Sequence, residues 1–413
     1  MKKKYTNINV YEASKERIRQ LYMQFDTIVV AFSGGKDSTA ALNVTIEVAR
    51  EMGKLPVKTV FFDEECINFE TIEFAERTMQ RPEVEMYWYC VNIKHRNACS
   101  NLEPFWWSWD PTKKDLWVRP MPAHAITEIK GFNGIEQDEK TGIPYAFKCL
   151  FQEKELGKVL IITGIRASES LRRYRINAAR ENDNYITAPG GGKLKNMTNA
   201  HPIYDWSADD VWIAVSKFGW DYNVSYDMFN KTTMNNRLSA QRICAPFGEE
   251  PIRGLWIYKE CFPAYWAKLC TRVKGVGAAV RYANTPIYSV GMKKPPEGLT
   301  WYQYTELALD NYKDAEYILV KKNIDDLIDM HYKKSILEIT EDVPDVISGV
   351  CWKFLCKIAI KGDFKQRIAG TASSHSEKTQ KELGLNFAEA VLKFGTKKYQ
   401  RICKQKYPEL FNS

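Results

Sequence analysis

The chain has 413 residues, of which 45% are hydrophobic and 13% aromatic, and its formal net charge is +8. This composition is ample for globular packing, and the length predicts two or three domains. No run approaches the length of a membrane-spanning helix and no apolar stretch follows Met1 to Tyr5, so we expect a cytoplasmic protein without membrane contact. The mild positive charge suits anionic ligands but does not single out nucleic acid.

The first informative stretch is a strand, a glycine-rich turn and a helix in direct succession. Residues 27–32 have the pattern of a buried strand, and a helical pattern extends from Ala40 to a plausible C-cap at Gly53. Between them, residues 33–39 read Ser-Gly-Gly-Lys-Asp-Ser-Thr, which supplies backbone amides, a lysine and hydroxyl groups. This combination predicts a phosphate-binding loop at a helix N-terminus. Asp37 would repel phosphate unless a cation intervenes, which indicates a magnesium ion.

Strands and helices alternate along the first half of the chain. After the first helix we expect a strand at 57–62, a helix at 69–79 and strands at 85–91 and 159–163. Such alternation predicts a parallel sheet with right-handed crossovers, in which ligands bind beyond the carboxyl ends of the strands. The loop after the first strand and the acidic run Asp63 to Glu65 lie at such ends, so we expect them to face one cleft.

Residues 92–146 interrupt the alternation with a tryptophan-rich insertion. Its tryptophans are interleaved with lysine and arginine, so they suit stacking against a nucleobase, but they suit equally a small core that folds the insertion onto the sheet. We favour the small core for most of the tryptophans. His95, Arg96 and Arg119 are polar and border the expected cleft, so we interpret them as substrate-binding residues.

A second basic cluster follows the strand at 159–163. The strand ends in Gly164, and Arg166 comes two residues later. Glu169 and Arg173 are spaced i, i+4, so on a helix they can pair and hold guanidinium groups toward a phosphate or sulfate. Further along, we expect a helix that is capped at Ser207 and stops at Gly219.

The rest of the chain has a mainly helical pattern. We expect a helical extension at 221–330 and a basic helical region at 331–413, where 15 Lys and Arg face 9 Asp and Glu. A solvated helical surface explains that excess as well as a polyanionic partner does. Within the extension, Arg242 and the Pro-Phe-Gly turn at 246–248 are further candidates for reaching the cleft.

The loop at 33–38, Ser-Gly-Gly-Lys-Asp-Ser, resembles the PP-loop of ATP pyrophosphatases, and more narrowly that of the phosphoadenosine phosphosulfate (PAPS) reductase branch. Two later stretches are similar to motifs of the same branch: Gly-x-Arg-x-x-Glu-Ser-x-x-Arg at 164–173 and Pro-Ile-x-x-Trp at 202–206. Together with the tryptophan-rich insertion, they resemble a subgroup of bacterial and phage proteins named after an immunoglobulin-binding regulator. Members are commonly encoded beside a ParB/sulfiredoxin-like protein, so the resemblance implies such a partner.

The resemblance implies an α/β fold of the adenine nucleotide α-hydrolase type: a Rossmann-like parallel sheet with helices on both faces, plus a mainly helical C-terminal region. The nucleotide-binding domain would span 1–220. The implied ligand is ATP or PAPS, with magnesium if it is ATP and without an iron–sulfur cluster. The implied catalytic residues are Lys36, Arg166 and Arg173. The implied nucleotide-binding residues are Ser33, Gly34, Gly35, Lys36, Asp37, Ser38, Thr39, Asp63, Gly164 and Arg166, with Asp63 near the ribose or the metal.

Three functions are compatible with these residues. We favour an enzyme that acts at the α-phosphate, by ATP-pyrophosphatase-type adenylation or by sulfur transfer. Reduction or transfer of the sulfonate of PAPS is the alternative, but the chain lacks the Glu-Cys-Gly-x-His tail with which PAPS reductases supply their thiol. The third is a nucleotide-sensing or nucleic-acid-binding regulator that retains the pocket, and the basic region and the tryptophans favour it.

Overall fold

A computed structural model describes residues 7–100, 103–132, 142–151, 156–169, 173, 185–187, 197–232, 243, 245–248, 254–282, 295–364, 366 and 368–411. The chain divides into two compact units, and each is described by itself. The first comprises residues 1–100 and 105–284, and the second comprises residues 101–104 and 285–413. The division therefore falls near residue 284, whereas the boundaries expected from the sequence were at 220 and 330.

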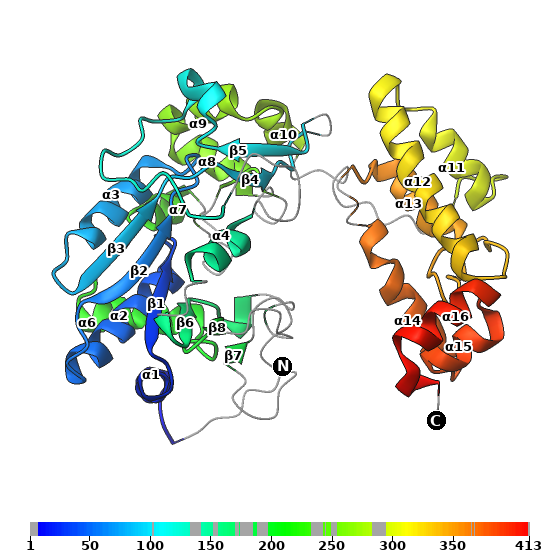
Figure 1. Ribbon diagram of the computed structural model, residues 1–413. Helices are drawn as coiled ribbons and strands as arrows, with labels where there is room; N and C mark the ends of the chain where they lie inside the picture. Colours follow the sequence, from blue (N-terminus) through cyan, green and yellow to red (C-terminus); the bar gives the residue numbers. More distant parts are fainter. Residues whose placement is uncertain are drawn as a thin grey trace. The chain divides into compact units, whose positions relative to one another are not determined.

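The first unit is built on a six-stranded sheet in the order β3-β2-β1-β6-β8-β7 (Figure 1). Its strands pair in parallel except for β7, which runs antiparallel to β8. The predicted mostly parallel α/β sheet is confirmed. The strands are β1 Thr27–Phe32, β2 Val57–Phe62, β3 Val84–Tyr89, β6 Val159–Thr163, β7 Ile186–Thr187 and β8 Met197–Ala200.

Helices cover both faces of this sheet because successive side chains of a strand point to opposite sides. On β1, Val30 enters a core shared with α1, α2, α3 and α6, whereas Val29 enters a second core shared with α4. Both valines are at most 2% exposed, and burial of such a side chain is worth about 1.5–3 kcal/mol. The helices are α1 Val10–Gln24, α2 Lys36–Glu51, α3 Phe69–Met79, α4 Ile143–Leu150 and α6 Ala208–Phe218.

The tryptophan-rich insertion forms a hairpin that packs onto the first unit. Its strands β4, Ile93–Arg96, and β5, Phe105–Ser108, pair antiparallel, and a 3-10 helix follows at Pro111–Leu116. Trp106 packs edge-on against Phe247, and Trp109 packs edge-on against Trp117. These buried contacts agree with the predicted small core. Both rings are covered by other parts of the protein.

Four further helices belong to the first unit, which explains why its boundary lies beyond residue 220. They are α7 Ser225–Thr232, α8 Leu255–Cys261, α9 Pro263–Arg272 and α10 Val276–Tyr282. Their apolar side chains share one core with Cys66 and Val118, which come from the sheet and its insertion. α8 and α9 are separate helices, because Pro263 cannot continue the backbone hydrogen bonds of α8.

The second unit is helical, as expected for the C-terminal region. Its helices are α11 Trp301–Leu309, α12 Asp314–Lys334, α13 Trp352–Lys361, α14 Ala372–Glu382, α15 Phe387–Phe394 and α16 Lys397–Lys406. The main core of the unit lies between α11, α12 and α13, where Leu309, Val320 and Leu355 are almost fully buried.

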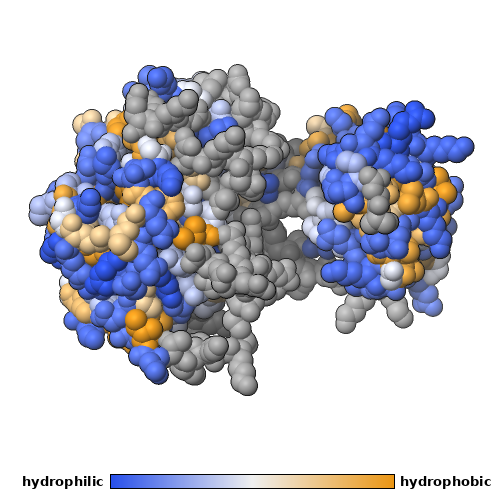
Figure 2. All heavy atoms as spheres, turned by 60° about the horizontal axis from the view of Figure 1, so that its bottom comes forward, coloured by the Kyte–Doolittle hydropathy of each residue, from blue (hydrophilic) through white to orange (hydrophobic). Residues whose placement is uncertain are grey.

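Among the described helices, none combines the length and the apolar character that a membrane crossing requires. In the view of Figure 2, hydrophilic side chains predominate on the described surface and hydrophobic ones form small separate patches.

The end of β6 approaches the first turn of α2 so closely that only glycine fits at position 164. A Cβ atom at Gly164 would lie 2.4 Å from both the carbonyl carbon of Asp37 and the amide nitrogen of Ser38. Backbone atoms cannot turn aside as a flexible side chain can, so one of the two segments would have to move.

We therefore expect Gly164→Ala to destabilise the protein by about 1–3 kcal/mol, which is the usual cost of overpacking. Gly254→Ala is the matched control, because its Cβ would meet only Ile257 Cδ1 at 4.0 Å. Urea denaturation of both variants measures the difference. Equal midpoints would show that the end of β6 and the first turn of α2 separate without cost.

Candidate functional site

The loop between β1 and α2 is held in shape by its own side chains. Ser33 N donates to Ser38 Oγ at 3.2 Å, and Ser38 Oγ in turn donates to the carbonyl oxygen of Gly35 at 2.9 Å. Thr39 Oγ1 donates to the same carbonyl oxygen at 2.9 Å. At Gly34, φ is +70° and a Cβ would lie 2.8 Å from Thr71 Cγ2, so glycine is required on both counts.

A cavity of about 430 Å³ lies over this loop at the carboxyl ends of β1 and β6. Five of the predicted loop residues line it: Ser33, Gly35, Lys36, Asp37 and Ser38. The opposite wall comes from residues 163–165, Glu169 and Arg173, and from Tyr226 of α7. Ile243, Ala245 and Gly248 complete the lining, so the Pro-Phe-Gly turn does reach the cleft. Arg242 lies outside the described residues.

Lys36 is the first residue of α2 and its side chain is nearly buried at the cavity. Its Nζ lies 3.5 Å from a carboxylate oxygen of Asp37 and 5.5 Å from the centroid of the Tyr226 ring. The backbone N–H of Lys36 donates to the Tyr226 hydroxyl at 2.9 Å. Burial lowers the pKa of Lys36, because removing the ammonium group from water disfavours its charged form.

Arg166 neutralises Asp37 rather than lining the cavity. Its Nε donates to Asp37 Oδ1 at 2.6 Å, its Nη1 donates to Ser168 Oγ at 3.0 Å, and the residue is 1% exposed. The carboxylate at the start of α2, which would otherwise repel a phosphate, is therefore compensated within the protein. The role of Arg166 at the site is consequently indirect.

The pair predicted at Glu169 and Arg173 forms as expected. Arg173 Nη1 donates to Glu169 Oε2, and both residues line the cavity. The side chain of Arg173 remains 30% exposed, so it is accessible to a ligand in the cavity.

Asp63 lies beneath the cavity surface and does not line it. Its carboxylate accepts hydrogen bonds from Trp88 Nε1 at 3.0 Å, from Arg119 Nη2 and from the backbone N–H of Glu65 at 3.0 Å. The side chain is fully buried, so the structure does not bring it to the position expected beside a ribose or metal. Its neighbour Glu64 lines the cavity instead.

The three residues interpreted as substrate-binding do not line the cavity either. His95 stacks on Trp106, and burial, assisted by the nearby Arg272, lowers the pKa of its imidazole to about 3. Arg96 is exposed on β4. Arg119 pairs with Asp63 and lies over the Trp109 ring, although its buried Nε and Nη1 have no hydrogen-bond partner in the described part of the chain.

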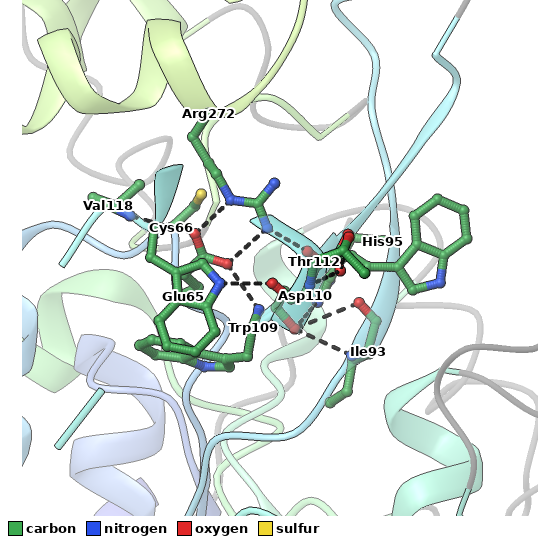
Figure 3. Close-up of polar contacts among 12 residues, drawn as sticks. Glu65, Cys66, Ile93, His95, Trp109, Asp110, Thr112, Val118 and Arg272 are labelled. Carbon is green, nitrogen blue, oxygen red and sulfur yellow. Dashed lines mark hydrogen bonds and ion pairs between the residues drawn. The ribbon is translucent and has the colours of Figure 1, made fainter. Parts of the chain in front are cut away.

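A buried ion pair ties the loop after β2 to helix α9 (Figure 3). Arg272 Nε and Nη2 donate to the two carboxylate oxygens of Glu65 at 2.6 and 2.8 Å, and both side chains are at most 1% exposed. The backbone N–H of Trp109 donates to Glu65 Oε2 at 2.7 Å. Glu65 has a φ of +61°, an unfavourable conformation for a residue with a side chain, so these contacts hold a strained loop.

The sequence analysis missed Glu64 and Tyr226. The acidic run after β2 was expected at the cleft, but the sequence did not reveal which of its carboxylates would be exposed there. The partners that bury Asp63 and Glu65 are Arg119 and Arg272, which are 56 and 207 residues away along the chain. Nothing in the local pattern around Tyr226 indicates its approach to Lys36.

The described residues do not form a metal site of their own. They contain no cluster of three His, Cys, Asp or Glu side chains that could hold an ion. Of the cavity carboxylates, Asp37 is paired with Arg166 and Glu169 with Arg173. The donor set therefore does not fit a resident magnesium ion.

The chain matches two families in succession. Residues 27–229 match the phosphoadenosine phosphosulfate reductase domain, and residues 236–317 match a domain of unknown function, DUF3440. The cavity draws on both stretches, because Ile243, Ala245 and Gly248 lie in the second.

Two relatives have similar sequences. The uncharacterized protein YbdN of Escherichia coli (strain K12) is 30% identical over 394 residues, which cover 91% of this chain and 93% of YbdN. The uncharacterized protein MJ0066 of Methanocaldococcus jannaschii is 28% identical over 200 residues, which cover 48% of this chain and 33% of MJ0066.

Solved structures show weaker similarity. The FMN adenylyltransferase of Candida glabrata, in complex with FAD and inorganic pyrophosphate, is 14% identical over 52% of this chain and 58% of its own, with a TM-score of 0.34. The PAPS reductase of Candida auris, in a phosphate complex, is 13% identical over 55% of this chain and 94% of its own, with a TM-score of 0.31. The match spans little more than half of the adenylyltransferase, and TM-scores this low carry no weight for function.

We expect Arg272→Met to destabilise the protein by about 3–5 kcal/mol, because it leaves the Glu65 carboxylate buried without a partner. The double variant Glu65→Gln/Arg272→Met should lose less than the sum of the two single variants. The control is Arg77→Met, which breaks a pair of side chains that are 43% and 53% exposed and should cost less than about 1 kcal/mol.

Urea denaturation measures all of these variants. Losses of the same size for Arg272→Met and Arg77→Met would contradict a structural role for the buried pair.

Proposed function

We propose that this chain, which belongs to the family of the uncharacterized Escherichia coli protein YbdN, is an adenine-nucleotide enzyme that acts at the α-phosphate of ATP and releases pyrophosphate. The proposal is carried by one observation: a glycine-rich loop and a buried lysine at a helix N-terminus, both in the stretch that matches the PAPS reductase domain, line a cavity. Amides and dipole at such a terminus favour phosphate groups.

The residues around the cavity would divide the work as follows. The backbone amides of Gly34, Gly35, Asp37 and Ser38 and the ammonium group of Lys36 would hold the leaving phosphates, since the N–H of Lys36 is already donated to the Tyr226 hydroxyl. Arg173 would stabilise the negative charge that develops during transfer, because its guanidinium remains accessible while Glu169 orients it. Arg166 would act indirectly, by neutralising the charge of Asp37.

Adenylation is favoured over a thiol-based reduction of PAPS by the position of the cysteines. Nine described cysteines are free thiols, and none of them lines the cavity. Burial raises the pKa of the thiols of Cys66 and Cys90, the two closest in sequence to the loop after β2, so neither is a ready thiolate. Cys244 lies outside the described residues. Sulfur transfer from a separate carrier remains compatible with this arrangement.

Several finer assignments extend the proposal. Membership of the immunoglobulin-binding-regulator subgroup, a ParB/sulfiredoxin-like partner, a cytoplasmic location and the absence of an iron–sulfur cluster stay predictions. A magnesium ion would arrive with the phosphates of ATP, since the chain offers no cation cluster among its described residues.

We expect Lys36→Ala to weaken ATP binding by about 10-fold or more, because the variant has no buried ammonium group within reach of the phosphates. Lys54→Ala, at an exposed lysine after the same helix, should leave the affinity unchanged. Isothermal titration of ATP with magnesium measures both variants, and a coupled assay follows pyrophosphate release. The proposal fails if the wild-type protein binds no ATP, or if Lys36→Ala binds it as tightly as the wild type.

Nucleic-acid binding is a second candidate function, and the surface of α13 favours it. Lys353, Lys357 and Lys361 follow one another at i, i+4 spacing and line a cavity of about 420 Å³ in the second unit. Lys357 and Lys361 have no carboxylate partner in the described part of the chain, which leaves their charge available to an anion.

If this second function holds, the full chain should bind single-stranded DNA with an affinity that falls steeply with salt and survives Lys36→Ala. The double variant Lys357→Gln/Lys361→Gln should reduce both the affinity and the salt dependence, by about 0.7 in log–log slope for each phosphate that it no longer neutralises. Lys381→Gln, at an exposed lysine of α14, is the control. Fluorescence anisotropy at several salt concentrations measures the DNA affinity of each variant. An unchanged affinity of the double variant would contradict this second function.

A further inference from the structure

Glu64 lies between two carboxylates that are fixed by arginines. On one side, Asp63 is bound by Arg119 and by the indole of Trp88. On the other side, Glu65 is bound by Arg272 through two hydrogen bonds. Three acidic residues in succession would repel one another if all of them faced the cavity, and the two arginines remove the outer two from it.

The side chain of Glu64 has a different environment from its neighbours. It lines the cavity together with Lys36 and Arg173. No hydrogen bond or ion pair joins its carboxylate to the described part of the chain, although each of the other two cavity carboxylates, Asp37 and Glu169, is paired with an arginine. Glu64 is therefore the carboxylate that is left to act on a ligand.

The position of Glu64 is fixed from both sides. Glu65 adopts its left-handed backbone conformation while Arg272, Trp109 N–H and Val118 N–H hold its carboxylate. Asp63 N–H donates to the carbonyl oxygen of Tyr89 at 2.9 Å, which anchors the start of the loop to β3. The backbone of Glu64 is therefore held from both sides, which keeps this residue at the edge of the cavity.

Burial, reinforced by the Asp63 carboxylate, raises the pKa of Glu64 to about 7. The other charged or titratable groups that line the cavity are Lys36 and Asp37 of α2, Glu169 and Arg173 after β6, and Tyr226 of α7. A carboxyl with a pKa near neutrality is present partly as the base and gains a proton readily, which suits proton transfer at physiological pH.

We propose that Glu64 is the general base that takes the proton from the nucleophile attacking the α-phosphorus. This inference rests on the proposed adenylyl transfer and adds to it the residue that activates the acceptor. The acceptor is a group that carries a proton on the attacking atom, such as a hydroxyl, an amine or a thiol.

The step balances without a further reactant. As the nucleophile forms its bond to the α-phosphorus, the bond between that phosphorus and the bridging oxygen breaks. The bonding electron pair leaves with pyrophosphate. Lys36 and the loop amides stabilise the negative charge of this leaving group. The proton of the nucleophile passes to the Glu64 carboxylate and from there to solvent. With water as the nucleophile, the products are AMP, pyrophosphate and a proton.

The experiment uses the full chain, ATP with magnesium, and water as the acceptor. Glu64→Gln keeps the size and polarity of the side chain but cannot take the proton. We expect its rate of pyrophosphate release to fall about 100-fold or more, with ATP affinity within about threefold of the wild type. Glu64→Asp should recover part of the rate. Glu73→Gln, at an exposed glutamate of α3, is the matched control and should behave as the wild type.

The dependence of the rate on pH separates a base from a merely structural residue. The wild-type rate should rise with pH through the pKa of Glu64, since only the ionised form accepts a proton, and this rise should be absent in Glu64→Gln. A Glu64→Gln variant with the wild-type rate and pH profile would overturn the inference about Glu64 but not the proposed function. A decrease in ATP affinity that accounts for the whole decrease in rate would also overturn it, because the residue would then serve binding.

Failure of the proposed function has a different signature. In that case the wild-type protein itself would release no pyrophosphate from ATP, and the inference about Glu64 would fall with it.

Discussion

The ion pair between Arg166 and Asp37 is the interaction on which the site depends. It joins the end of β6 to the first turn of α2, at the place where Gly164 lies against the backbone of the loop. Without a compensating cation, the Asp37 carboxylate would oppose any anion at this helix N-terminus. With the pair formed, the charges that remain at the cavity are those of Lys36, of the Glu169–Arg173 pair and of Glu64.

The second half of the cavity comes from segments that the strand–helix alternation does not contain. The tryptophan-rich hairpin and helices α7 to α10 share a core with the loop after β2, and the Glu65–Arg272 pair fixes that loop from α9. Residues 236–317, which match a domain of unknown function, therefore help to build the wall of the cavity as well as its supports. Both matched stretches therefore contribute residues to the cavity.

The sequence predicted the parts of the structure that depend on local pattern. The parallel strands, the loop at 33–38 and the Glu169–Arg173 pair follow from alternation, glycine spacing and i, i+4 geometry, and each is found where it was expected. The burial of Asp63 and Arg119 could not be predicted, because each is the partner of the other across 56 residues of chain. Polarity alone suggested ligand contacts for these two residues and for His95, whereas Asp63 and Arg119 form an ion pair and His95 stacks on Trp106.

The same reasoning explains why the sequence did not single out Glu64 as a cavity residue. A run of three acidic residues gives no local sign of which carboxylate will be paired, and the two arginines that decide it come from the insertion and from α9. The expected boundaries at 220 and 330 differ from the division near residue 284 for a related reason. Helical periodicity predicts helices in this part of the chain, but only the shared core shows that α8 to α10 belong to the first unit.

The most direct measurement is a crystal structure of the full chain with a non-hydrolysable ATP analogue and magnesium. We expect the β- and γ-phosphates within hydrogen-bond distance of Lys36 Nζ and of the amides of Gly34, Gly35, Asp37 and Ser38, with the α-phosphate facing Arg173 and Glu64. A nucleotide bound elsewhere, or phosphates turned away from this loop, would contradict the assignment of the cavity as the site of adenylyl transfer.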